Sequence, residues 1–365
     1  MNKERLARLR DLMTERGIDA IGIVPSANLF YLTGLHMHLS ERVTLAIFTR
    51  AEAHLIVPAL EVPRVESRTK IPLTLHAWTD ADWVGAGWDS LKHALPLEGK
   101  NVAVDYYNVR VLELTQLQNF APTLKLSDAS ELFTALRMTK DAAEIEAMRR
   151  AARVLESSLE ALIPEIRVGK REKEIAARWQ WLMFEHGADG IPEAPIVAAG
   201  ENSAQPHTTA TARELQNGDM LILDGSCTVD GYYGDITRTL AIGAVSEEMK
   251  RIYELTLRAN EAGRAAARPN ALCQDVDRAA RAVIRNTGYG DFFLHRTGHG
   301  LGLEVHEPPN MLEGDMRVLQ NGMTFTVEPG IYLAGKGGVR IEDDVVVTQD
   351  GNESLTVSAR ELRVL

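Results

Sequence analysis

A β-hairpin that carries two acids is predicted by the stretch Leu221-Ile-Leu-Asp-Gly-Ser-Cys-Thr-Val-Asp-Gly-Tyr-Tyr-Gly-Asp-Ile-Thr-Arg-Thr239. The pair Asp230-Gly231 in its middle is a strong signal for a two-residue turn. The runs on either side are rich in β-branched and aromatic residues. With this pair as the loop, Asp224 faces Thr237 and Asp235 faces Ser226. Because side chains alternate between the faces of a strand, both carboxylates are expected on one face.

A second pair of acids repeats the pattern near the end of the chain. Glu328 ends the run Met323-Thr-Phe-Thr-Val-Glu328, and Glu342 lies in Val339-Arg-Ile-Glu-Asp-Asp-Val-Val-Val347, beyond a glycine-rich stretch. The two glutamates are therefore expected on opposite arms of a second hairpin. Four carboxylates in one buried cleft would repel one another unless cations neutralise them, and two divalent ions would cancel the four charges.

One histidine completes a candidate metal site. His299 lies in Thr297-Gly-His-Gly-Leu-Gly302, where neighbours without side chains allow close approach to a crowded centre. One imidazole with four carboxylates suits Mn, Co or Zn, with Mn as the first choice. Two such ions, roughly 3.5 Å apart, would hold a hydroxide between them as the nucleophile for attack on a carbonyl group.

Each motif also has a purely structural interpretation. Asp224-Gly225 could end a strand, Glu328-Pro-Gly could form a turn, and His299 could be a packed loop residue. The joint pattern favours the metal site, because the acids lie inside apolar β-runs where an unpaired charge costs several kcal/mol.

These motifs resemble those of the pita-bread metallopeptidases, and within them the Xaa-Pro peptidases, prolidase and Xaa-Pro aminopeptidase. The N-terminal stretch Asn28-Leu-Phe-Tyr-Leu-Thr-Gly34 is also similar to this family. The other matching stretches are Asn202-Ser-Ala-Gln-Pro-His207, Gly234-Asp-Ile-Thr-Arg-Thr239, Thr297-Gly-His-Gly-Leu-Gly-Leu-Glu-Val-His-Glu307, Thr326-Val-Glu-Pro-Gly330 and Gly338-Val-Arg-Ile-Glu-Asp343.

The resemblance implies a role for each site residue. The five metal ligands would be Asp224, Asp235, His299, Glu328 and Glu342. His207 and His306 would bind substrate and move protons around the tetrahedral intermediate, and Glu328 would act as acid and base. Arg340 would orient the acidic ligands. Taken alone, each of these histidines and this arginine would be read as a surface residue.

One departure from the family concerns the substrate carboxylate. Prolidases often carry an arginine shortly after the His-Glu motif, whereas this chain has His306-Glu-Pro-Pro-Asn310. We hypothesise that Arg42, reaching in from a partner subunit, supplies the cation. Its alternative interpretation is a solvated loop arginine.

The pattern along the chain predicts two domains of α/β (α+β) class. The first covers residues 1–132 and the second covers residues 137–365, with a pseudo-twofold αβ repeat. The resemblance implies that the first is a creatinase-like α/β domain for substrate access and dimerisation and that the second is a pita-bread catalytic domain. The first domain begins with a helix from Lys3 to Arg16. Its strand-like runs are Ile21–Val24, Val43–Phe48, His54–Val57 and Val102–Val104. The repeat consists of two helices before each acidic hairpin, near residues 141–163 and 171–186, and again near 246–267 and 273–287.

Composition excludes several kinds of partner. A net charge of -11 argues against nucleic acid as a binding partner. The sequence contains no run of about 18 apolar residues, so no membrane span is expected. The charged N-terminus lacks a signal peptide, and two cysteines are too few for a disulfide framework, so a cytoplasmic protein is expected.

The resulting prediction is a dinuclear metallopeptidase that cleaves small peptides with proline at the second position. Prolidase (Xaa-Pro dipeptidase) is placed ahead of Xaa-Pro aminopeptidase acting on longer peptides, and the family resemblance implies a homodimer. A non-peptide amide hydrolase and a non-catalytic binding protein remain as alternatives.

Overall fold

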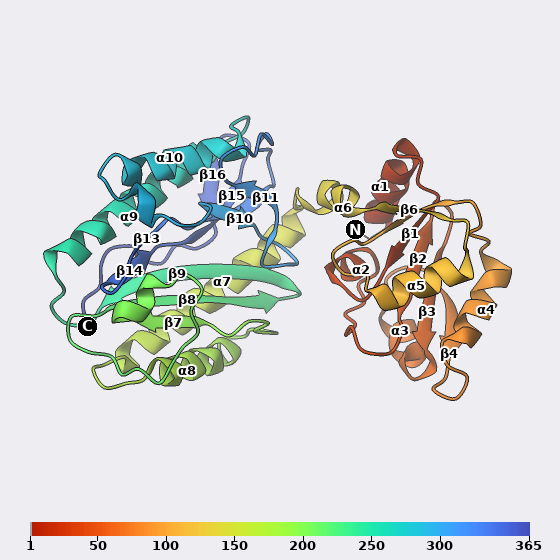
Figure 1. Cartoon of the computed structure of the whole chain (residues 1–365), viewed down its shortest axis with the longest axis horizontal. Coiled ribbons are helices and arrows are strands. Elements are labelled where there is room, and N and C mark those ends of the chain that lie inside the picture. Colours follow the sequence, from red (N-terminus) through yellow and green to blue (C-terminus); the bar gives the residue numbers. More distant parts are fainter. Residues whose placement is uncertain (1) are drawn as a thin grey trace. The chain divides into compact units, whose positions relative to one another are not determined.

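The computed structural model describes residues 2–365 and separates into two compact units, Met1–Arg137 and Met138–Leu365. Figure 1 labels their elements along the chain.

The first unit is built on a six-stranded mixed sheet in the order β4-β3-β2-β1-β5-β6. The antiparallel pairs are β1 with β2 and β2 with β3, and the remaining neighbours are parallel. The strands are β1 (Ala20–Ile23), β2 (Leu45–Thr49), β3 (Ala53–Pro58), β4 (Thr74–Trp78), β5 (Asn101–Val104) and β6 (Lys125–Asp128). The helices are α1 (Asn2–Glu15), α2 (Ala27–Thr33), α3 (Val62–Arg68), α4 (Gly85–Ala94), α5 (Val111–Phe120) and α6 (Ser130–Arg137).

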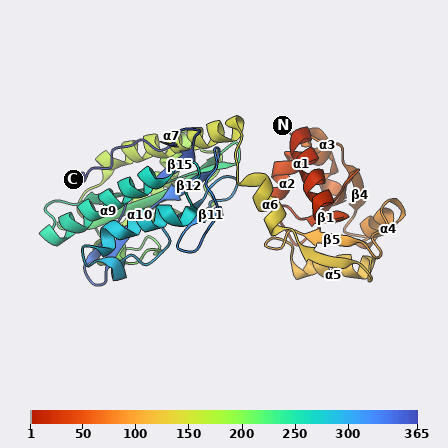
Figure 2. The ribbon, with the colours of Figure 1, turned by 90° about the horizontal axis from the view of Figure 1, so that it is seen from above.

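The central strands of this sheet are buried on both faces because helices pack against them. All residues of β1 and β3 are buried, which is the pattern of strands covered by helices. The predicted N-terminal helix is present as α1, and the four predicted strand-like runs coincide with β1, β2, β3 and β5. Figure 2 shows the unit from above, with helices on its outside.

The second unit repeats one order of elements: two helices and then paired strands. Its helices are α7 (Ala142–Leu162), α8 (Glu172–Glu185), α9 (Glu247–Ala266) and α10 (Cys273–Arg285). The first set of strands is β7 (Ile196–Ala199), β8 (Met220–Val229) and β9 (Tyr232–Ala241). The second set is β10 (Gly298–Gly300), β11 (Glu307–Met311), β12 (Thr324–Val327), β13 (Gly330–Leu333), β14 (Gly337–Arg340), β15 (Asp343–Val347) and β16 (Asn352–Ser354). This order agrees with the predicted repeat.

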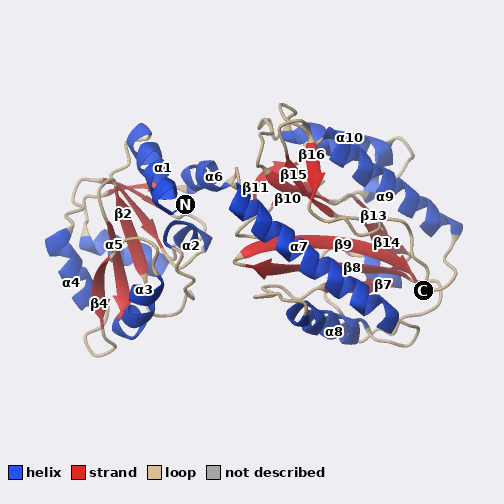
Figure 3. Cartoon of the chain, turned by 180° about the vertical axis from the view of Figure 1, so that it is seen from behind, coloured by secondary structure: helices blue, strands red, loops and turns tan. Residues whose placement is uncertain are grey.

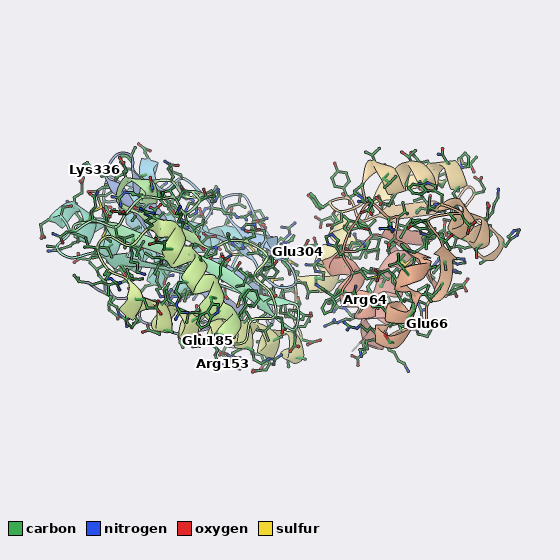
Figure 4. All side chains as sticks on the ribbon, turned by 90° about the horizontal axis from the view of Figure 1, so that it is seen from below. Arg64, Glu66, Arg153, Glu185, Glu304 and Lys336 are labelled. Carbon is green, nitrogen blue, oxygen red and sulfur yellow. The ribbon has the colours of Figure 1, made fainter. Side chains whose placement is uncertain are left out.

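Two apolar layers hold the halves of the repeat together. Helices α7 and α8 pack against β8 and β9 around the buried Trp179 and Leu223, and Figure 3 shows α7 lying along these strands. Helices α9 and α10 pack against the second set of strands around Ile252 and Ile341. Charged side chains such as Arg153 and Glu185 lie on the outer surface of α7 and α8 (Figure 4). Within residues 2–365, no helix is long and apolar enough to cross a membrane.

The register of the first acidic hairpin confirms the prediction. Asp224 pairs with Thr237 and Asp235 with Ser226 across β8 and β9. The turn residues Asp230 and Gly231 have φ angles of 52° and 82°, as a two-residue hairpin turn of this sequence requires.

The second acidic hairpin has Glu328 and Glu342 on opposite arms, as predicted, but its ladder is interrupted between them. Strand β12 pairs with β15 and β13 pairs with β14 in the same register, which places Glu328 opposite Glu342 at the break between the two pairs. Pro329 has no N–H to donate to the ladder. The backbone amide of Glu328 donates to Thr297 O, just before β10, and that of Glu342 donates to Thr237 O of β9. The carboxylates therefore project from a gap in the sheet.

Candidate metal centre

The predicted site residues of the second unit surround one cavity of about 260 Å³. Loops before β7 and after it, the hairpin β8–β9, strand β10 and the second hairpin all contribute. Its lining includes ten acidic, imidazole and guanidinium side chains: Asp224, Asp235, His299, Glu328, Glu342, His207, His306, Arg340, His295 and Arg296.

Three of these side chains offer a ready set of metal donors. Asp235, His299 and Glu342 are buried, and one donor atom from each lies within 4.8 Å of the others. Glu328 joins them, since its Oε1 lies 3.2 Å from His299 Nε2. The chemistry of this set, one imidazole nitrogen with carboxylate oxygens, fits Mn, Co or Zn.

Backbone hydrogen bonds tie the two glutamates to the strands that carry the other donors. The amide of Glu342 donates to Thr237 O at 3.1 Å, two residues from Asp235. The amide of Glu328 donates to Thr297 O at 2.7 Å, two residues from His299. Groups that are far apart in the sequence are thereby fixed around one point.

Glycines beside His299 are required by close approach of the backbone. A Cβ atom at Gly298 would lie 1.8 Å from Thr326 O, and one at Gly300 would lie 2.4 Å from Glu307 O. The His299 amide donates to Thr326 Oγ1 at 3.1 Å. The expectation that small neighbours let His299 enter a crowded centre is therefore confirmed.

The charges of the centre are unbalanced in a way that a cation would correct. Burial and the charges of neighbouring acids raise the pKa of Asp235 and the pKa of Glu342 well above the usual range. Burial also acts on Glu328, but the hydrogen bond and charge of His299 outweigh it and lower the pKa of Glu328 to about 2. A positive ion favours the ionised form of all such carboxyl groups.

Asp224 is held by an arginine. Its Oδ2 accepts a hydrogen bond from Arg340 Nη2 in a buried ion pair, and Asp224 is the neighbouring acid that most strongly raises the pKa of Asp235. Arg340 Nε also donates to Thr237 Oγ1 at 3.3 Å, and that hydroxyl donates to Glu342 Oε2 at 2.6 Å. Arg340 thus contacts groups on both hairpins.

A chain of hydrogen bonds that the sequence did not reveal continues from Arg340. Its Nη1 donates to the Tyr332 hydroxyl at 2.8 Å, which lies 2.8 Å from His295 Nε2. His295 Nδ1 lies 2.7 Å from the carbonyl oxygen of Arg296. A carbonyl only accepts, so Nδ1 carries the proton and Tyr332 donates to Nε2. The only signal in the sequence was the position of His295 four residues before His299.

The two predicted substrate histidines differ in their surroundings. His306 packs edge-on against His299 with ring centroids 4.2 Å apart, and burial together with the charges of His299 and Arg296 lowers its pKa to about 4. His207 follows the short helix Gly200–Ala204 and is exposed at the cavity.

Arg42 lies in the first unit, and its guanidinium is already engaged. Its Nε and Nη2 donate to the two carboxylate oxygens of Asp80 at 3.0 and 2.9 Å, and its Nη1 donates to Glu41 at 2.8 Å. A role for Arg42 in substrate binding remains a prediction, and it would require this pair to open.

Comparison with known proteins places both units. Residues 146–349 match the model of metallopeptidase family M24, and residues 5–139 match the Creatinase/Prolidase N-terminal domain. The chain is 34% identical to an Xaa-Pro dipeptidase of Pyrococcus furiosus over 99% of each sequence. It is similar to the crystal structure of a prolidase from Thermococcus sibiricus, with a TM-score of 0.95, 33% identity and coverage of 100% of this chain and 99% of the other. An X-Pro aminopeptidase from Thermotoga maritima has a TM-score of 0.87 and 32% identity, with 99% of each chain covered.

Proposed function

Because the chain belongs to metallopeptidase family M24, we propose that it is a prolidase, a peptidase that hydrolyses Xaa-Pro dipeptides. The observation that carries the proposal is the cavity in which Asp235, His299 and Glu342 bring their donor atoms within 4.8 Å of one another. The similarity of the whole chain to an Xaa-Pro dipeptidase and to a prolidase supports Xaa-Pro dipeptides as the substrate class.

The proposed metal site holds two divalent ions, with Mn as the first choice and Co or Zn as alternatives. Its ligands are Asp224, Asp235, His299, Glu328 and Glu342. The raised pKa values of Asp235 and Glu342, caused by burial and mutual repulsion, support this assignment. When bound, such ions would polarise the scissile carbonyl and lower the pKa of water.

The side chains of the chain would then divide the remaining work. The hydrogen bond and charge of His299 lower the pKa of Glu328 and keep it ionised, and we assign this carboxylate to take the proton from the attacking water. The low pKa of His306 keeps its imidazole neutral near pH 7, and we assign it and His207 to the oxyanion of the tetrahedral intermediate. Arg340 would hold Asp224 in place.

Proline suits this arrangement for a chemical reason. The bond before proline is a tertiary amide without N–H, so a peptidase that must accept a hydrogen bond from that group cannot use it. Contacts to the carbonyl side avoid the requirement. The apolar residues Pro195, Ile196 and Val305 in the cavity wall offer a surface for the proline ring.

Xaa-Pro aminopeptidase is the second candidate. It is favoured by the similarity to the X-Pro aminopeptidase from Thermotoga maritima and by Asn310 at the place where prolidases often carry an arginine. A binding protein without catalysis is less well supported, because all five ligand positions are intact. A non-peptide amide hydrolase is less well supported, because the similar proteins are named Xaa-Pro dipeptidase and prolidase.

The test is hydrolysis of Ala-Pro and of Ala-Pro-Ala by metal-depleted protein after addition of Mn, Co or Zn. We expect no turnover without metal and a kcat/KM for Ala-Pro at least tenfold above that for Ala-Pro-Ala, which corresponds to about 1.4 kcal/mol. Equal or faster cleavage of Ala-Pro-Ala would establish the aminopeptidase. Silence on both peptides with all three metals would favour the non-peptidase alternatives.

We also propose that the chain forms homodimers through its first unit. Exposed apolar side chains on and near α5, among them Tyr107, Val111 and Leu112, support a contact surface there. Light scattering would give the mass of the particle, and a monomer at micromolar concentration would contradict the proposal.

A cytoplasmic location is proposed as well. Cys227 and Cys273 are both unpaired and buried, which is the state expected of thiols in a reducing compartment. Fractionation of the native host would test this.

A further inference from the structure

A dipeptide substrate places a strict demand on the cavity. Its free carboxylate carbon is three bonds from the scissile carbonyl carbon, so the group that binds it must lie in the same cavity wall as the metal donors. That wall also contains the acids Glu193, Asp224 and Glu328. A carboxylate entering such surroundings needs a cation. The following inference rests on the proposed function and names this cation.

Two guanidinium groups line the cavity among the described residues, and they differ in their availability. Arg340 is buried and donates to Asp224, Tyr332, Thr237 and Pro206 O. These bonds occupy all of its nitrogen atoms. It is therefore part of the framework and cannot also form a paired contact with a substrate.

Arg296, in contrast, has guanidinium nitrogen atoms available for a substrate. It is half-buried, and the hydrogen bond found for its guanidinium runs from Nη1 to Asn310 Oδ1 at 2.6 Å. That contact fixes one end of the group. Asn310 lies opposite His299 in the pairing of β10 with β11, so Arg296 is anchored beside a metal donor.

The electrostatics agree with this position. Burial lowers the pKa of Arg296, and the charge of Glu328 raises it. In turn, the charge of Arg296 contributes to the low pKa of His306. Arg296 is thus close enough to act on both proposed catalytic side chains, while no carboxylate forms an ion pair with it among residues 2–365.

We propose that Arg296, held by Asn310, binds the free carboxylate of the C-terminal proline and makes the enzyme selective for dipeptides. A guanidinium fixed at one nitrogen can present its other N–H groups as a planar fork, which matches the two oxygens of a carboxylate. Asn310, which stands where prolidases often carry an arginine, thus holds the guanidinium of Arg296 instead of supplying the positive charge itself.

The experiment compares Ala-Pro with Ala-Pro amide, which has the same scissile bond but no carboxylate. We expect Arg296→Gln to lower kcat/KM for Ala-Pro by about 30-fold or more, mainly through KM, because a charged hydrogen-bond pair is lost. Cleavage of Ala-Pro amide should change less than about twofold. Asn310→Ala should show a smaller loss with the same selectivity, and Arg296→Lys should recover part of it.

The matched control is Arg278→Gln, which removes a surface arginine that pairs with Glu313 and should affect neither substrate. Arg42→Gln tests the alternative anchor. A selective loss of Ala-Pro cleavage in Arg42→Gln in place of Arg296→Gln would overturn the inference. So would equal losses on both substrates in Arg296→Gln, because these would indicate a structural role.

A binding measurement separates this inference from the proposed function. Titration calorimetry with L-proline and with prolinamide should show that Arg296→Gln weakens only L-proline binding to the manganese-loaded protein. Absence of Ala-Pro cleavage in the parent would refute the prolidase assignment, while selective loss of L-proline binding would still support the carboxylate site. Unchanged or absent L-proline binding would refute that site.

Discussion

Glu328 and Glu342 are the same residue type and lie opposite each other, yet their pKa values shift in opposite directions. Burial acts on both, but Glu328 receives a hydrogen bond from His299, whereas Glu342 faces the charges of Asp235 and Glu328. The neighbours therefore decide which carboxylate is ionised without a cation. At this scale, the partner of a side chain matters more than its identity.

Thr237 is one such partner, and its removal should weaken metal binding. Its hydroxyl donates to Glu342 Oε2 at 2.6 Å and opposes the rise in the pKa of that glutamate. We expect Thr237→Val, which keeps the shape of the side chain, to reduce Mn affinity about tenfold. Titration calorimetry would measure the Mn affinity of the variant and of the parent. The control is Thr256→Val, which removes a buried hydroxyl bonded within α9, and equal affinity of both variants would contradict the prediction.

The elements differ in how much of their geometry is local. The first acidic hairpin follows from its Asp-Gly turn and alternating strands, so its register was predictable. The second hairpin breaks at Pro329, where the glutamate amides bond to Thr297 and Thr237. Those bonds join segments that are distant in sequence, which no local pattern contains.

A side chain at the second position of the first hairpin's turn should destabilise the protein. Gly231 has a φ of 82°, where a Cβ atom costs about 1 to 2 kcal/mol. We expect Gly231→Ala to lower the free energy of unfolding by that amount, measured by urea denaturation. Gly85→Ala is the control, since its Cβ would enter open space at the start of α4. An equal effect in both variants would show that the turn is not strained.

The second unit as a whole is joined by the buried Asp343. Arg238 of β9, Arg264 of α9 and Arg360 near the C-terminus reach its carboxylate at 3.0, 3.6 and 2.7 Å. Arg238 also donates to Thr237 O. Both halves of the repeat and the end of the chain thus meet behind Glu342. The comparisons confirm the predicted fold class, a creatinase-type domain followed by the pita-bread domain of family M24.

Removing the charge of Asp343 should destabilise the entire unit. Asp343→Asn leaves three buried or half-buried arginines without their shared anion, and breaking such a buried pair costs about 3 to 5 kcal/mol. Urea unfolding followed by fluorescence of the buried Trp179 would measure the loss. Glu353→Gln removes a half-exposed partner of Arg149 and should cost less than about 1 kcal/mol. A similar cost for both variants would exclude a central role for Asp343.

The sequence by itself determined what depends on neighbouring residues. It indicated the α1 helix, the order of helices and hairpins, and the register that puts Asp224 and Asp235 on one face, because alternation and turn preference act over a few residues. It also pointed to the residues that surround the cavity. Their roles as ligands remain predictions.

Only the tertiary structure decided the partners of the charged and polar groups. It paired Arg340 with Asp224 and Tyr332, engaged Arg42 with Asp80, and brought Arg296 to Asn310. Such contacts join segments that fold from distant parts of the chain, and burial then sets their strength and pKa. The spacing of residues in the sequence does not predict which distant side chains will be in contact. Arg296 could therefore be inferred as the anchor for a substrate carboxylate only from the folded cavity.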